Sequence, residues 1–194
     1  MLTRADLYSL EEYAQIRPEF RRKVIAHKAN RRLPLGEHAA LYFESALTMQ
    51  YQVQEMLRIE RIFEQAGIQE ELDVYNPLIP DGNNWKATFM LEFPDEHERR
   101  IALRRLVGIE QKLFLQIADT APVYPIYNED LDRSTEDKTA AVHFMRFELS
   151  PVQIMALQNG AELRAVIDHP AYQVDLKVPD PVRQALLADL QPVN

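Results

Sequence analysis

Apolar side chains stand at every second position in several short segments of this chain. Residues 86–93 show this most clearly: Ala87, Phe89, Leu91 and Phe93 alternate with Lys86, Thr88, Met90 and Glu92. Further strands are expected over residues 39–44, 113–118, 123–127, 141–149, 162–168 and 172–178. Strict alternation means that one face of a sheet is packed and the other is wetter. It therefore favours an antiparallel or mixed sheet over a buried parallel one.

Helical patterns occupy other segments. In residues 46–66 an apolar stripe recurs at helical spacing, and Gly67 is expected to end that helix. Residues 1–33 also have helical character, with Ser9 and Glu12 at the spacing of a capping box and Pro18 expected to break or restart the helix. Ser150-Pro151-x-Gln153 is a strong helix start. Helices are expected over residues 95–111, 150–160 and 180–190.

These helices and strands do not alternate regularly enough for a doubly wound sheet. We therefore predict an α+β fold, with a mostly antiparallel or mixed sheet of about seven short strands packed against several helices. A chain of 194 residues is the size of one domain with an extension. Residues 1–33 are expected to form a basic helical N-terminal arm, and residues 34–194 a single α+β domain.

Charge and composition exclude several classes of protein. The chain has 30 acidic and 22 basic side chains, a net charge of −8, which disfavours non-specific binding of DNA or anionic lipid. It has no cysteine, so disulfides, thiolate nucleophiles and cysteine-held metals are excluded. No apolar run suits a membrane span or a signal peptide, and we expect a cytoplasmic protein. Residues 128–138 are expected to be an acidic polar loop.

Positive charge is concentrated in residues 17–32. Seven cations stand there against one acid, Glu19, a local charge of +6: Arg17, Arg21, Arg22, Lys23, Lys28, Arg31 and Arg32. Phe20 is the single aromatic residue among them and no nucleic-acid module is present, so nucleic-acid binding is an unfavoured third possibility. The segment favours a solvated helix or a docking surface for an acidic partner.

The helix predicted over residues 46–66 carries polar candidates. Tyr51, Glu55 and Arg58 are spaced four and three apart, so they share one face and are candidate binding residues. Glu60 falls on the apolar stripe between Met56 and Phe63, where a carboxylate needs a partner or a metal. A structural network of Glu and Arg is the first interpretation, and a metal site is the alternative.

Two other segments supply candidate binding residues. Trp85 and Lys86 stand at the start of a strand, where the only tryptophan either fills the core or anchors an interface. Tyr172 closes the turn at residues 168–172, which gathers a carboxylate, an imidazole and a phenol. Loops carry function more often than strands do, so we weigh a functional role for this turn equally with a structural one.

A metal site would have to be assembled by the fold, because no two histidines form a close ligand pair on one element. The candidate ligands are oxygen and nitrogen donors that favour iron, manganese or zinc: His38, Glu60, His143, Asp168 and His169. His143 shares the apolar face of its strand, so a satisfied core histidine is the stronger interpretation there.

Several stretches together resemble a bacterial family of unknown function. They are residues 47–58, 75–82, 85–88, 143–149 and 168–172, and the resemblance extends over nearly the whole chain. Genes of that family often neighbour genes for rubrerythrin-type di-iron proteins and iron–sulfur oxidoreductases. The resemblance therefore implies a cytosolic role near peroxide or electron-transfer chemistry, and it assigns no role to any residue.

Two hypotheses follow. The first is a cytosolic accessory protein of a redox or oxidative-stress system, either an adaptor or a small-ligand-binding partner, which binds a protein partner or a second copy of itself. The absence of a nucleophile motif and of a glycine-rich phosphate loop favours it. The alternative is a metal-binding protein or metal-dependent enzyme that uses the histidines and carboxylates named above.

Overall fold

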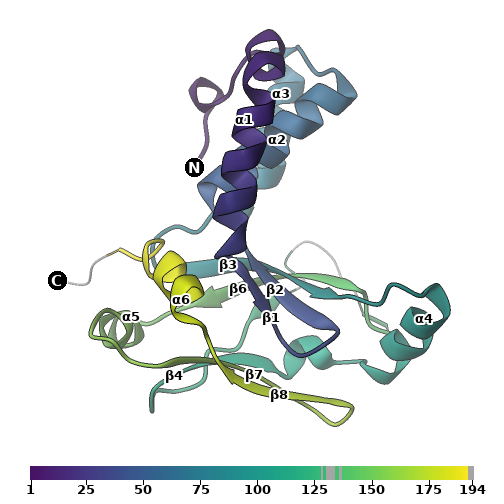
Figure 1. The fold of residues 1–194 in the computed structure, drawn as a ribbon, viewed down its shortest axis with the longest axis vertical. Coiled ribbons are helices and arrows are strands. Elements are labelled where there is room, and N and C mark those ends of the chain that lie inside the picture. Colours follow the sequence, from purple (N-terminus) through teal and green to yellow (C-terminus); the bar gives the residue numbers. More distant parts are fainter. Residues whose placement is uncertain (128, 130–133, 136, 192–194) are drawn as a thin grey trace.

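The computed structural model describes residues 1–127, 129, 134–135 and 137–191. A body built on two antiparallel sheets carries a layer of three helices that projects from it, and we call this layer the helical arm (Figure 1). The predicted α+β class and helical N-terminal arm are therefore confirmed. No helix in these described ranges is long and apolar enough to cross a bilayer.

The α-helices are α1 (Leu10–Ala29), α2 (Ala46–Glu60), α3 (Gln65–Tyr75), α4 (Glu96–Arg105), α5 (Pro151–Gln158) and α6 (Asp180–Leu187). The strands are β1 (Arg32–Pro34), β2 (Ala39–Phe43), β3 (Asn84–Leu91), β4 (Leu113–Ile117), β5 (Ile126–Tyr127), β6 (Val142–Glu148), β7 (Leu163–His169) and β8 (Tyr172–Lys177). Short 3-10 helices span Arg4–Asp6, Asn76–Leu78 and Ile109–Gln111.

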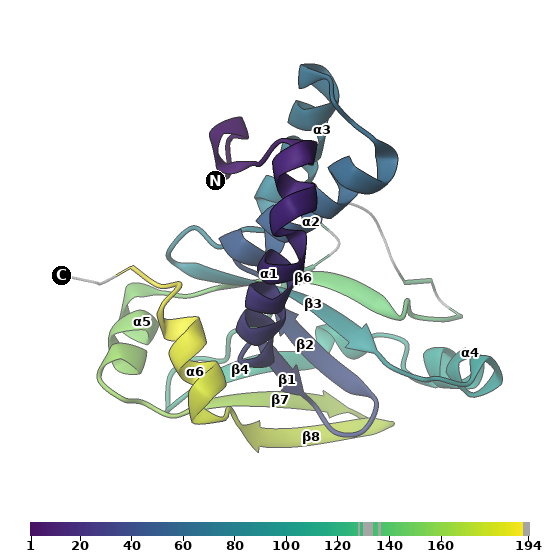
Figure 2. The ribbon, with the colours of Figure 1, turned by 45° about the horizontal axis from the view of Figure 1, so that its top comes forward.

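The two sheets enclose the main core. The larger sheet has the strand order β1-β2-β3-β6-β5 and the smaller one β4-β7-β8. In the centre of the larger sheet Trp85 pairs with Phe147 and Phe89 with His143, and all four side chains are buried. Helices α5 and α6 flank the body on one side and α4 on the opposite side (Figures 1 and 2). In β3, β4, β6 and β7 the alternation seen in the sequence thus marks the face that is buried in the core.

The helical arm has small cores of its own. Tyr13, Phe20 and Val24 of α1 pack with side chains of α2. A second cluster joins Leu57 of α2 to Leu72 of α3. The arm therefore contains α2 and α3 as well as α1, so it draws on residues 46–75, which the sequence analysis grouped with the body.

Helix α1 runs through Pro18 without interruption, so the prediction of a break or restart there is wrong. Proline inside a helix removes one backbone hydrogen bond and clashes with the carbonyl four residues earlier. That carbonyl belongs to Ala14, an exposed residue, where water can satisfy it. Burial of Tyr13 and Phe20 on either side of the proline stabilises the continuous helix.

The prediction of one helix over residues 46–66 is also wrong, because α2 ends at Glu60 and α3 begins at Gln65. Arg61 adopts the left-handed conformation, with φ of 55°, and the N–H of Ile62 donates to the carbonyl of Leu57. This is a helix C-terminal motif with a residue other than glycine in the left-handed position. Gly67, the expected stop, lies inside α3.

Three smaller differences concern residues 95–138. Helix α4 ends at Arg105, and residues 109–111 form a separate 3-10 turn rather than its continuation. In the segment predicted as a strand over 123–127, β5 is limited to Ile126–Tyr127, and Val123 makes an isolated bridge to Leu115. The acidic loop expected at 128–138 lies partly outside the described residues, at 128, 130–133 and 136.

Candidate functional site

Helix α1 carries five of the seven cations of the basic segment, and local hydrogen bonds and charges stabilise both of its ends. The Ser9 side chain accepts a hydrogen bond from the backbone N–H of Glu12, and the Glu12 side chain accepts one from the N–H of Ser9. His27 and Lys28 occupy the last turn, where positive charge suits the helix dipole. The 20-residue helix therefore presents its cations along one rigid rod.

Three of the seven predicted cations form intramolecular ion pairs. Arg17 binds both carboxylate oxygens of Glu55 on α2, with N···O distances of 2.7 and 2.8 Å. Arg31 is only 5% exposed and binds both carboxylate oxygens of Asp189. Arg32 pairs with Glu92 at 2.8 Å. The fold therefore brings a carboxylate to each of these three cations, and only Arg31 is buried.

The other four cations, Arg21, Arg22, Lys23 and Lys28, are exposed. None of them has an ion pair with any residue in the described ranges. Ile25 stands among them with 55% of its surface exposed. The positions 21, 25 and 28 are spaced four and three apart, so they lie on one side of α1. Arg22 lies beside them, whereas Lys23 is about 160° from Ile25 around the helix, on the opposite side. We call Arg21, Arg22, Ile25 and Lys28 the basic face of α1.

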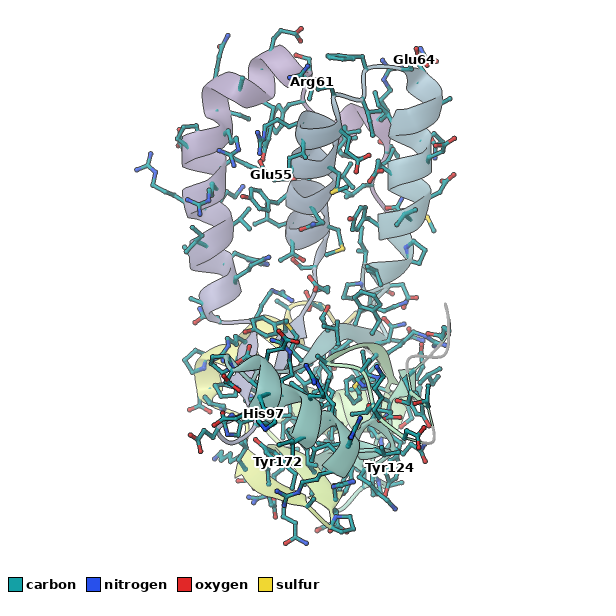
Figure 3. All side chains as sticks on the ribbon, turned by 90° about the vertical axis from the view of Figure 1, so that its right-hand side faces the viewer. Glu55, Arg61, Glu64, His97, Tyr124 and Tyr172 are labelled. Atoms are coloured by element: carbon teal, nitrogen blue, oxygen red, sulfur yellow. The ribbon has the colours of Figure 1, made fainter. Side chains whose placement is uncertain are left out.

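Glu55 is the centre of a structural network between α1 and α2 (Figure 3). Arg17 and Arg58 donate to its carboxylate, and the hydroxyl of Tyr13 donates at 2.7 Å. The hydrogen bond from Arg17 is the main reason why the pKa of Glu55 falls to about 2. Burial and the adjacent Glu55 raise the pKa of Tyr13. Glu55 and Arg58 thus belong to a structural network of Glu and Arg, the first interpretation given above for this helix face. The third candidate on that face, Tyr51, packs beside Phe20.

Trp85 and Lys86 both have structural partners. Trp85 is 1% exposed, and its indole N–H donates to the carbonyl of Leu186 at 2.9 Å. The amino group of Lys86 donates to the carbonyl of Pro77 at 2.8 Å. Trp85 fills the core, which excludes the interface-anchor alternative for it.

The metal candidates are dispersed over the fold. Glu60 is exposed at the end of α2, so its expected burial on an apolar stripe is wrong: the break at Arg61 redirects the chain. Asp168 is exposed as well. His143 lies in the larger sheet and His169 in the smaller one. Across the described ranges no three His, Cys, Asp or Glu side chains come together in a way that could hold a metal ion.

Each candidate histidine makes local contacts. His143 is fully buried, and its Nε2 lies 2.9 Å from the hydroxyl of Thr139. That hydroxyl donates in turn to Glu110, a carboxylate only 1% exposed. His169 Nδ1 accepts from the N–H of Ala171, and its Nε2 lies 3.1 Å from a carbonyl of residue 107. These contacts orient both rings within the protein.

Two predicted site residues do come together. The hydroxyl of Tyr172 accepts a hydrogen bond from the backbone N–H of His38 at 3.0 Å, although 134 residues separate them. Sequence reasoning did not single out Asp189 or Glu110, which pair with Arg31 and Thr139. No local pattern marks either residue, since both gain their roles through contacts across the fold.

The class that this structure defines is an α+β protein with a projecting helical arm and a basic face on its first helix. A family model described as "Protein of unknown function (DUF3501)" matches residues 1–190, and the chain belongs to this family. It is similar to the crystal structure of a novel protein of unknown function from Burkholderia pseudomallei K96243, with a TM-score of 0.91 and 49% sequence identity. The match covers 98% of this chain and 99% of that one. No curated protein matches.

Proposed function

We propose that the chain is a non-catalytic accessory protein that docks an acidic protein partner on the basic face of α1. One observation carries the proposal: Arg21, Arg22, Lys23 and Lys28 are exposed and have no ion pair with any described residue, whereas three neighbouring cations of the same segment do. Three of these charges, on Arg21, Arg22 and Lys28, lie together. On a chain with a net charge of −8 they form a local positive region that can steer and orient an acidic surface.

The position of this face supports docking. Helix α1 lies in the arm, which projects from the body, so a partner can approach it without first displacing the sheets (Figures 1 and 2). The exposed side chain of Ile25 adds apolar area at the centre of the charged positions. A hydrophobic centre with a charged rim is the usual composition of a protein interface.

The resemblance stated above suggests which partner to test first. We propose a cytoplasmic role beside a redox or oxidative-stress system, with a rubrerythrin-type di-iron protein as the first candidate partner. A second copy of this chain is the other candidate, because its acidic regions have the charge that the basic face requires.

Binding to that di-iron protein, measured by isothermal titration at two salt concentrations, tests the proposal. We expect R21E/R22E to weaken the affinity by on the order of tenfold, because it reverses two charges of the face. R104E/K112E is the matched control: it makes the same change in net charge at two exposed residues of the body that have no ion pair in the described ranges. Equal affinities for the two variants would contradict the proposal.

A zero-length cross-linker, which joins amines to carboxylates, provides a second readout. Cross-links from Lys28 to Asp or Glu of the partner are expected, and Lys23, on the opposite side of α1, should form fewer. Sedimentation velocity distinguishes a partner from a second copy of the chain. Tighter binding of a nonspecific DNA duplex than of the acidic protein would instead assign the face to phosphate.

A further inference from the structure

A hollow in the body lies where α4 meets the turns that precede β2 and β8. Its lining comes from separate segments of the chain and includes His38, Phe93, Ala102, Arg105, Leu106 and Tyr172. Its volume is about 230 Å³. Sites for drug-sized ligands begin at roughly 300 Å³, so this hollow suits a ligand of one ring.

Tyr172 forms one wall of the hollow, and two hydrogen bonds to its hydroxyl group hold this side chain in place. The hydroxyl donates to the carbonyl of Leu35 at 2.7 Å and accepts from the backbone N–H of His38 at 3.0 Å. The turn at residues 35–38 is therefore tied to the start of β8, and Figure 3 shows Tyr172 in the body, away from the arm. Because this wall is ordered before binding, the protein loses less conformational entropy when a ligand binds.

A second wall is aromatic. The imidazole of His38 stacks on the ring of Phe93, with centroids 4.3 Å apart and planes inclined by 22°. His38 Nδ1 lies 3.3 Å from the backbone carbonyl oxygen of Glu92, which fixes the ring orientation. Ala102 and Leu106 complete the hollow with apolar surface. A flat ring can pack against these groups in the offset or edge-on arrangements that aromatic rings prefer.

The lining of the hollow includes a cation. Arg105 lines it, is exposed, and makes no hydrogen bond or ion pair with any part of the chain that the structure describes. The lining contains no carboxylate. Glu37 and Glu92 line the neighbouring, more open hollow on the other side of His38. Glu92 is already paired with Arg32 at 2.8 Å, and Glu37 is 87% exposed to solvent.

We propose that this hollow binds a small aromatic carboxylate. The ring packs against Phe93 and Leu106, and the carboxylate pairs with the guanidinium of Arg105, whose fork geometry matches two carboxylate oxygens. The site lies in the body and uses no residue of the basic face of α1. A negative result for ligand binding in this hollow would therefore leave the proposal of partner docking unchanged, and the reverse also holds.

Benzoate is the probe, titrated into the ¹⁵N-labelled full chain and followed by the backbone amide signals of Phe93, Ala171 and Tyr172. We expect saturable shifts with a dissociation constant on the order of 1 mM. R105Q should weaken benzoate binding at least about fivefold, because it removes the charge that pairs with the carboxylate. R104Q, at an exposed residue outside the lining, should leave it unchanged.

Two comparisons separate ring burial from charge. Benzamide, a neutral molecule of the same shape, should bind wild type more weakly than benzoate does, and R105Q should remove that difference. A102L should block both ligands by filling the hollow. The absence of saturable shifts up to about 10 mM benzoate would overturn the proposal, as would equal benzoate affinity in wild type and R105Q.

Discussion

Arg31 and Asp189 form a two-pronged ion pair across 158 residues of sequence, with both N···O distances at 2.8 Å. Arg31 follows the end of α1, and Asp189 follows the end of α6. The guanidinium also donates to the carbonyls of Glu44 and Ala185. The pair thus joins the base of the helical arm to the C-terminal part of the body, and it removes one cation from the surface that the sequence suggested.

Removal of one partner from this pair should destabilise the protein strongly. D189A leaves the nearly buried guanidinium of Arg31 without its counter-ion, and we expect a loss of about 3 kcal/mol in the free energy of unfolding. Urea denaturation measures the loss. D168A is the control, because Asp168 is exposed and has no ion pair in the described ranges, and it should change stability little. Similar losses in both variants would show that the pair contributes nothing specific.

Glu55 should make stability depend on pH in the acid range. Its pKa is lowered from 4.5 to about 2, chiefly by the hydrogen bond from Arg17. A depressed pKa in the folded state means that the contribution is complete above pH 4.5 and is lost as the pH falls toward 2. E55Q should therefore lose about 2 kcal/mol at neutral pH, a loss that shrinks through this window.

The matched control for Glu55 is E19Q, because Glu19 is exposed on α1 and has no ion pair within the described ranges. Its unfolding free energy should follow that of wild type at every pH. A constant gap between wild type and E55Q from pH 7 to 2 would contradict the assignment of that gap to ionised Glu55.

The hydroxyl of Thr139 bridges two buried groups, Glu110 and His143. T139V removes a hydrogen bond from a buried carboxylate, and we expect a loss of about 2 kcal/mol in the free energy of unfolding. T139S keeps the hydroxyl and should recover most of that loss. Chemical denaturation of the two variants side by side checks this prediction, and a loss in T139S as large as that in T139V would contradict it.

Gly36 and Gly108 both have a positive φ angle, but only Gly36 lies close to another side chain. Alanine substitutions at the two positions therefore separate the effect of backbone strain from that of a steric clash. Their φ angles are +78° and +81°, so alanine is strained at either position, by about 1 kcal/mol. A Cβ at Gly36 would lie 2.7 Å from the hydroxyl of Tyr172, whereas one at Gly108 meets nothing within 4 Å. G36A should therefore lower the melting temperature clearly more than G108A. Equal effects would show that Tyr172 moves aside without loss.

Pro18 provides a prediction of the opposite sign. It lies exposed inside α1, so P18A restores a helical hydrogen bond and removes no buried contact. Proline in a helix interior costs about 3 kcal/mol relative to alanine, and we expect a gain in unfolding free energy that approaches this figure. E19A, at the next and equally exposed position, should change stability little. If P18A does not raise the free energy of unfolding, the prediction is wrong, and local adjustment of α1 already relieves the strain at the proline.

Patterns within a few residues of one another predicted the fold class well. The alternation around Phe89 and Phe147 locates the core strands, since side chains of a strand point alternately to its two faces. The capping signals at Ser9 and Ser150 locate two helix starts, and both occur with the expected hydrogen bonds. These signals work because the contacts that cause them lie three or fewer residues apart.

Pairing between distant residues could not be predicted in this way. Arg17, Arg31 and Arg32 have the same local character as the four exposed cations, and only the fold supplies each with a carboxylate 38 to 158 residues away. The break at Arg61 has no glycine or proline to announce it, and Glu60 was misplaced for that reason.

The sequence by itself determined the α+β class, the faces of the core strands, and the start and charge of the first helix, because hydrophobic period and capping are local properties of the chain. Tertiary structure decided which of its cations form ion pairs, where His38 meets Tyr172, and that the candidate metal ligands are dispersed over the part of the chain that the structure describes. The free energy of a buried ion pair or a shaped hollow depends on the distances between segments. Those distances exist only after the sheets and the helical arm have packed.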